Sequence, residues 1–187
     1  MEQELTTARL RLRPIRRSDA ERVQALCSNW NVARMLSRVP YPNPLEAVEA
    51  WTGAQAEARD SGLTYTFAIE HRHGLIGVVG VSRCDDGGYE IGYWLGEPWW
   101  GQGLMTEAVG RVVDFARATL GLDRLRSDYI ADNPASGRIQ QKCGFRITGR
   151  GRLNSQSRGC EVEAVFTELD LAGTGPGPGR DPDRAAS

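Results

Sequence analysis

The feature that most constrains this fold is a junction between a strand-like run and a helix, marked by two glycines. An apolar run at residues 89–95 precedes Gly101 and Gly103, and helical periodicity begins directly after them. The apolar residues that repeat at helical spacing are Leu104, Ala108, Val109, Val112, Val113, Ala116 and Leu120. Glycines allow a sharp turn and leave the first helical turn, with its unpaired N–H groups and partial positive charge, open. The junction can therefore hold a phosphate or another anion, or it can be an ordinary turn.

Two familiar phosphate-binding loops do not fit this junction. The third glycine of a dinucleotide-binding fingerprint would fall at position 106, which is Thr106. A P-loop needs a lysine directly after its second glycine, and the only lysine of the chain, Lys142, lies far away.

Composition excludes several classes of protein. The 187 residues suffice for one domain with a substantial core, and the net charge of −1 provides no basic field for nucleic acid or anionic membranes. The four cysteines contain no C-x-x-C pair, so neither a zinc site nor a disulfide framework is expected. There is no apolar run of about 20 residues and no signal-peptide pattern. We therefore expect a cytoplasmic protein without metal, nucleic-acid or membrane partners.

The periodicity along the chain predicts a mixture of strands and helices. We expect strands at residues 8–14, 65–70, 75–81, 89–95, 124–130, 145–148 and 161–171, the last with Val162, Ala164 and Phe166 alternating on one face. We expect helices beginning at residues 18, 30, 45, 104 and 134, the first capped by Ser18 with Glu21 completing a capping box. Residues 1–172 should form one domain, and the Gly/Pro-rich segment 173–187 should be disordered. His71 and His73 fall in a turn, where we expect no site.

Glu90 is the first candidate for chemistry. On the strand at residues 89–95 it shares a face with Gly92 and Trp94. Partial burial beside a tryptophan would raise the pKa of this carboxylate and make it a better base near neutral pH. The alternative is a residue at the rim that is paired with an arginine.

Four separated motifs, in this order, resemble the GCN5-related N-acetyltransferase (GNAT) superfamily. They are Thr-Ala-Arg-Leu-Arg-Leu-Arg-Pro at 7–14, Tyr-Glu-Ile-Gly-Tyr-Trp-Leu at 89–95, Trp-Gly-Gln-Gly-Leu-Met-Thr-Glu-Ala at 100–108, and Asn-Pro-Ala-Ser…Lys-Cys-Gly-Phe at 133–145. The resemblance covers about residues 6–171 and is closer to the branch typified by the bacterial ribosomal-protein N-terminal acetyltransferases RimJ and RimL. It implies a single-domain α/β (α+β) fold, with a mixed, mostly antiparallel sheet that is splayed at the acyl-CoA site and flanked by helices.

The resemblance also implies how acetyl-CoA would be held. The junction residues would contact the pyrophosphate, the backbone of the preceding strand and Asn133 would contact the pantetheine arm, and two basic residues would lie near the phosphates. The implied binding residues are Trp94, Leu95, Gln102, Gly103, Leu104, Met105, Thr106, Asn133, Arg138 and Lys142. Two positions depart from the superfamily pattern: Trp100, which is common in the RimJ/RimL branch, and Met105, whose bulk would alter the packing of the phosphate loop.

The chemistry of acetyl transfer assigns two further roles. The attacking amine must lose a proton, for which we expect Glu90 to be the base, directly or through water. The departing thiolate needs a hydrogen bond, for which we expect Ser136, because Gln140 stands where many superfamily members carry an acidic tyrosine. Transfer would then proceed by direct attack in a ternary complex.

The expected function is an acetyl-CoA-dependent N-acetyltransferase acting on a protein or peptide N-terminal α-amine. The alternatives are a small-molecule amine acceptor, such as an antibiotic, a polyamine or an amino acid, and a non-catalytic acyl-CoA-binding module. A longer acyl donor and a homodimeric assembly also stay open.

Overall fold

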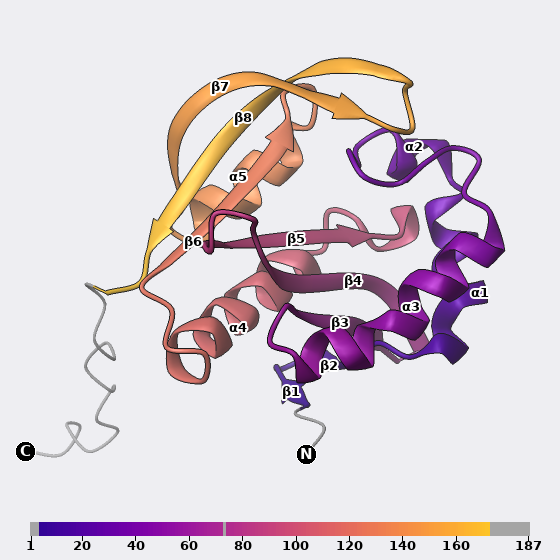
Figure 1. Ribbon diagram of the computed structural model, residues 1–187, viewed down its shortest axis with the longest axis horizontal. Helices are drawn as coiled ribbons and strands as arrows, with labels where there is room; N and C mark the ends of the chain where they lie inside the picture. Colours follow the sequence, from indigo (N-terminus) through magenta and orange to yellow (C-terminus); the bar gives the residue numbers. More distant parts are fainter. Residues whose placement is uncertain (1–3, 73, 173–187) are drawn as a thin grey trace, which may run out of the picture.

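One mixed sheet organises the computed structural model, which describes residues 4–72 and 74–172. The described residues form β1 (Leu5–Thr6), β2 (Arg11–Pro14), β3 (Thr64–His71), β4 (Gly74–Arg83), β5 (Tyr89–Leu95), β6 (Arg124–Ile130), β7 (Arg146–Ser155) and β8 (Cys160–Asp170). Their order across the sheet is β1-β2-β3-β4-β5-β6-β8-β7 (Figure 1). All neighbouring strands are antiparallel except β5 and β6, which are parallel. This confirms the predicted fold class.

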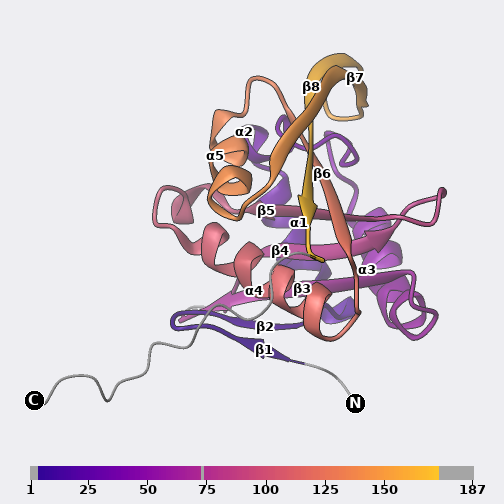
Figure 2. The same cartoon turned by 90° about the vertical axis from the view of Figure 1, so that its left-hand side faces the viewer.

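Helices cover both faces of this sheet. They are α1 (Ala20–Cys27), α2 (Trp30–Ala33), α3 (Leu45–Asp60), α4 (Leu104–Ala118) and α5 (Pro134–Lys142), with 3₁₀ turns η1 (Arg17–Asp19) and η2 (Glu97–Trp99). Helices α1 and α3 pack on one face of the β3–β4 hairpin, while α4 packs on the opposite face (Figure 2). Two apolar cores result, because each face of the hairpin is buried against its own helix layer.

Alternation along the strands separates these cores. Ile91 and Leu95 of β5 belong to the core under α4, while Trp94 packs against the core under α1 and α3. Helix α4 buries the side that its periodicity predicts, including Ala108, Val112 and Ala116. The face of β5 that carries Glu90, Gly92 and Trp94 is therefore directed toward α1 and α3.

The sheet opens between β5 and β6. The register of the described residues contains a single pair between these strands, Glu90 opposite Arg126. Beyond that pair β6 continues alongside β8, from Arg124 opposite Asp170 to Ile130 opposite Ala164. The backbone of β5 after Glu90 therefore has no strand partner on its β6 side, as the splayed sheet requires.

Two details differ from the sequence-based predictions. The predicted capping box of Ser18 and Glu21 is wrong, because Ser18 lies within η1 and α1 begins at Ala20. Phe166 is exposed, because both Ala164 and Val165 are buried and the alternation of β8 changes phase there, opposite a register shift in β7. The segment 173–187, with its predicted disorder, lies outside the described residues.

Candidate active site

The opening of the sheet leads into a large cleft. Its volume is about 1160 Å³. Its lining includes Val48 and Trp51 of α3 on one side of the sheet, and Met105 of α4 and Ile139 of α5 on the other. The cleft thus extends through the splay and joins the two helix layers, in the size range of a site for an extended organic ligand.

The N-terminus of α4 forms one end of the cleft. The residue before the helix, Gly103, has φ +75° and provides no side-chain cap. Gly101 has φ +72°, and nothing lies within 4 Å of where its Cβ would be. Uncapped N–H groups, the helix dipole and this open space suit an anion such as a pyrophosphate.

The side chains of this loop do not obstruct the open N-terminus of α4, which we call the anion seat. Leu104 and Met105 are buried in the core, Met105 with only 6% of its surface exposed, so its bulk is directed away from the loop. Gln102 is exposed, and its amide donates to the carbonyl of Pro98 at 3.1 Å. Thr106, in the first turn of α4, also lines the cleft. The loop can therefore offer mainly backbone groups to a ligand.

Arg9, which the sequence analysis did not single out, braces this loop from outside. Its Nη1 donates to the carbonyl of Gln102 at 3.0 Å, and its Nε and backbone N–H donate to Glu107 at 2.7 and 2.9 Å. Burial alone would raise the pKa of Glu107, but hydrogen bonds from Thr7 and Arg9 outweigh it and lower that pKa. An arginine in the turn before a strand gives no local sign of this contact, because the contact depends on tertiary packing.

The exposed edge of β5 offers main-chain groups to the gap. Ser127 Oγ on β6 donates to the carbonyl of Ile91, and Trp100 Nε1 donates to the carbonyl of Leu95. Main-chain groups along a strand alternate between its two sides, so those of Tyr93 and the N–H of Leu95 face the gap. The groups of Trp94 face β4 instead, which favours Leu95 over Trp94 as a main-chain contact for a ligand.

Helix α5 brings a hydroxyl pair to the gap. Asn133 caps the helix by accepting the N–H of Ser136 on its Oδ1 at 3.2 Å. Ser136 Oγ lies 2.9 Å from the hydroxyl of Tyr93, which comes from β5. Burial, partly offset by the bond to Ser136, raises the pKa of Tyr93 to about 12, so its hydroxyl is protonated at neutral pH.

Two other predicted residues of α5 are basic and exposed, whereas Ser136 is buried. Arg138 and Lys142 are exposed, and both line the cleft. They lie on the same helix as Ser136, and Lys142 is in its last turn. Their predicted contact with phosphates is compatible with this position and stays a prediction.

The opposite side of the cleft is acidic. Glu90 forms an ion pair with Arg38, an arginine in the segment after α2, at 2.5 Å. Asp128 of β6 lines the cleft beside Glu90, and its side chain has no hydrogen bond or ion pair with the residues that the structure describes. Burial and the charge of Glu90 raise the pKa of Asp128 above its ordinary value, while Arg38 acts in the opposite direction.

The structure thus brings the predicted residues of the α4 loop, β5 and α5 to one cleft, with the exception of Gln102, which is not part of the lining. Three further residues of the cleft were missed by sequence reasoning. Tyr93 alternates with Glu90 along β5 and lies on the opposite face of that strand, and the sequence analysis gives it no role. Asp128 follows Arg124 and Arg126 at the alternating polar positions of β6, so its charge alone does not mark it, and its proximity to Glu90 depends on a strand pairing that bridges 36 residues. Arg38 lies in a segment without periodicity, where the sequence gives no signal.

Other classes of site find no support in the described ranges 4–72 and 74–172. They contain no group of three or more His, Cys, Asp or Glu side chains placed to hold a metal ion. None of their helices is long and apolar enough to cross a bilayer. Of the two histidines, His71 ends β3 and His73 lies outside the described residues.

Comparison with known proteins agrees with this geometry. The [Ribosomal protein uS5]-alanine N-acetyltransferase of Escherichia coli is 27% identical over 185 residues, covering 92% of this chain and 93% of that protein. An uncharacterized N-acetyltransferase, p20 of Bacillus licheniformis, is 26% identical over 173 residues, 88% of this chain and 94% of its own.

Solved structures share the fold. RimL, a ribosomal L7/L12 α-N-protein acetyltransferase solved with coenzyme A, superposes with a TM-score of 0.81 at 17% identity, covering 92% of this chain and all of its own. The self-immunity acetyltransferase MccE, solved with acetyl-CoA and AMP, has a TM-score of 0.76 at 18% identity, covering 88% and 93%. A family model for the acetyltransferase (GNAT) domain matches residues 9–146, most of the chain. The chain therefore belongs to the GNAT family and is an N-acetyltransferase of that family.

Proposed function

We propose that this enzyme transfers the acetyl group of acetyl-CoA to the N-terminal α-amine of a protein or peptide. The observation that carries the proposal is one continuous cleft with an anion seat at α4 on one side of the sheet and an acidic face, Glu90 and Asp128, on the other. A diphosphate fits the first end, and a cationic amine fits the second. The similarity to a ribosomal-protein alanine N-acetyltransferase over 92% of the chain supports an α-amine acceptor. A ribosomal-protein acceptor would place the reaction in the cytoplasm.

Different residues would bind different parts of the donor, acetyl-CoA. The N-terminus of α4, with Gln102 to Thr106, would hold the pyrophosphate, and Arg138 and Lys142 would add positive charge near the phosphates. The main chain of β5 at Leu95, together with Asn133, would hold the pantetheine arm. The thioester would then lie in the opening between β5 and β6.

Transfer needs three bonding changes. The amine nitrogen forms a bond to the thioester carbonyl carbon, the carbon–sulfur bond breaks, and its electron pair leaves on sulfur. Of the two protons that an ammonium acceptor must lose, one passes to a carboxylate of the acidic face, for which Glu90 is the residue predicted from the sequence, and then to water. The other ends on sulfur to give the free thiol. Ser136, held by the protonated hydroxyl of Tyr93, would donate the hydrogen bond that stabilises the departing thiolate.

Calorimetric titration and a free-thiol assay test this proposal in two steps. Acetyl-CoA and desulfo-CoA should bind while ATP does not, and acetyl-CoA should then be consumed with peptides that carry a free N-terminus. The same peptides with a blocked N-terminus and an internal lysine are the matched control. Turnover with small amines but with no peptide would refute the proposed acceptor class, and failure to bind acetyl-CoA would refute the donor site.

The hydroxyl pair has a separate test. A hydrogen bond to a charged acceptor contributes about 1.5–3 kcal/mol, so Ser136→Ala should lower kcat by about 10- to 10²-fold. Tyr93→Phe should lower kcat less, with little change in KM for acetyl-CoA, because Tyr93 acts through Ser136. The double variant should be no worse than Ser136→Ala alone, and additive losses would refute the coupling.

A further inference from the structure

Two carboxylates face the acceptor side of the cleft, and their surroundings differ. Glu90 is paired through its Oε1 with Arg38, so one of its two carboxylate oxygens is already engaged. Asp128 has no such partner among the described side chains, and both carboxylates are half-buried and line the same cleft. An unpaired carboxylate in a cleft can accept a proton without first breaking another bond.

The backbone places Asp128 beside an open space. Glu90 lies opposite Arg126 in the parallel pair, so Asp128, two residues further along β6, is level with Gly92. Nothing lies within 4 Å of where a Cβ of Gly92 would be, and Gly92 is itself exposed. A small group can therefore occupy the space between Asp128 and β5, at the point where the sheet opens toward Ser136.

We propose that Asp128 is the carboxylate that receives the proton of the acceptor amine, and that the Arg38–Glu90 ion pair adjusts its proton affinity. This gives Asp128 the role that the sequence predicts for Glu90, and it rests on the proposed acetyl transfer. The ammonium gives one proton to Asp128, which passes it to water, and the neutral amine then attacks the thioester carbon. The second proton leaves the nitrogen after the attack and ends on sulfur, so protons and electron pairs balance.

The neighbouring charges act on Asp128 in opposite directions. Glu90 on β5 raises the pKa of Asp128, and Arg38, from the segment after α2, lowers it. Helix α5 contributes a neutral contact, Gln140 Nε2 to the main-chain carbonyl of Asp128 at 3.2 Å. The side chain of Arg38 is 72% exposed, so the ion pair is weak and can be removed without disturbing a core.

The experiment is the pH profile of kcat for acetylation of a free-N-terminal peptide, with acetyl-CoA binding measured for every variant. Asp128→Asn should lower kcat by about 10²-fold or more and remove the acid limb, since general-base catalysis contributes about 10²–10⁴-fold. Arg38→Gln should move the acid limb to higher pH, and Glu90→Gln should move it to lower pH with a smaller loss of kcat. Asp114→Asn, at an exposed carboxylate of α4 outside the cleft lining, is the matched control and should behave as wild type.

The outcomes separate this inference from the proposed function. If wild-type protein binds acetyl-CoA but acetylates no peptide, the proposed function fails, whatever Asp128 does. If wild type is active and Glu90→Gln loses more kcat than Asp128→Asn, or if Asp128→Asn keeps the acid limb, then Asp128 is not the proton acceptor. Normal acetyl-CoA affinity and unchanged circular dichroism of Asp128→Asn would establish that a loss of kcat does not come from misfolding.

Discussion

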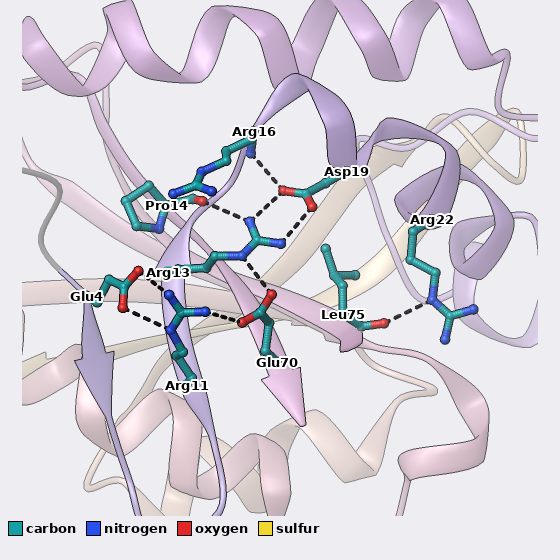
Figure 3. Close-up of polar contacts among 9 residues, drawn as sticks. All are labelled: Glu4, Arg11, Arg13, Pro14, Arg16, Asp19, Arg22, Glu70 and Leu75. Carbon is teal, nitrogen blue, oxygen red and sulfur yellow. Dashed lines mark hydrogen bonds and ion pairs between the residues drawn. The ribbon is translucent and has the colours of Figure 1, made fainter. Parts of the chain in front are cut away.

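The buried ion pair between Arg13 and Asp19 allows a stability prediction with a worked magnitude. Both residues are more than nine-tenths buried, where β2 leads into η1 and α1. Asp19 accepts both terminal nitrogens of Arg13 at 2.7 Å and the backbone N–H of Arg16 at 2.8 Å, and Glu70 accepts Nε of Arg13 at 2.7 Å (Figure 3). Removing one member of such a pair leaves a buried charge and costs about 3–5 kcal/mol.

Asp19→Asn should fall at the lower end of that range, because Glu70 still neutralises part of the charge of Arg13. We expect the free energy of unfolding to fall by about 3 kcal/mol and Tm by about 6–12 °C, measured by urea and thermal denaturation at pH 7. Glu4→Gln, which removes a partner of the exposed Arg11 in the same network, is the control and should leave Tm close to wild type.

The pH dependence gives an independent check. Burial would raise the pKa of Asp19, but hydrogen bonds from Arg13 and the N–H of Arg16 outweigh it and place that pKa below its ordinary value of 3.8. The folded protein therefore binds this proton more weakly than the unfolded chain does. The stabilisation is present above the unfolded pKa and is lost as the pH falls through the folded pKa. The gap between wild type and Asp19→Asn should accordingly shrink in acid. A loss at pH 7 of less than about 1 kcal/mol, as for a surface pair, would refute the reasoning.

Two further predictions concern the cleft. Arg9→Gln removes the brace on the loop before α4 and should weaken acetyl-CoA binding about 3- to 10-fold by calorimetry, a modest effect because Arg9 is half exposed; unchanged affinity would contradict a bracing role. Gly92→Ala adds a methyl group to open space, so it should leave Tm unchanged while raising KM for the acceptor about 10-fold or more. Gly77→Ala, whose Cβ would lie 2.4 Å from the carbonyl oxygen of Trp94, should instead lower Tm, and equal Tm losses in both variants would argue against an open acceptor space.

Local chemistry made part of this structure predictable. The glycines before α4 and the periodicity after them act within a few residues, so the helix and its open N-terminus follow from the sequence. The motifs that resemble the GNAT superfamily predicted the splayed sheet for the same reason: each is a continuous segment.

Contacts between segments that are distant in the sequence could not be predicted in this way. Ser18 and Glu21 fit a capping box, but packing against Arg13 recruited Asp19 and displaced the start of α1 to Ala20. Asp128 joins Glu90 only because β6 returns parallel to β5 after α4. Tyr93 packs its ring against the core, while its hydroxyl contacts Ser136 of α5. A tyrosine can be apolar along its ring and polar at its tip, so the position of Tyr93 in the strand gives no sign of this contact.

The hairpin of β7 and β8 has a consequence for which substrates can enter. Its connecting turn is joined to the segment after α2, with the N–H of Gln156 donating to Ser37 at 2.8 Å and Arg158 Nε donating to Arg34 at 2.9 Å (Figure 1). Arg158 also binds Asp132, just before α5, through two bonds of 2.9 Å. These ties join three segments along one side of the cleft, where Ser37, Asp132 and Gln156 are part of its lining. We therefore expect an acceptor to enter end first, which would favour chain termini and small amines over lysines within folded surfaces.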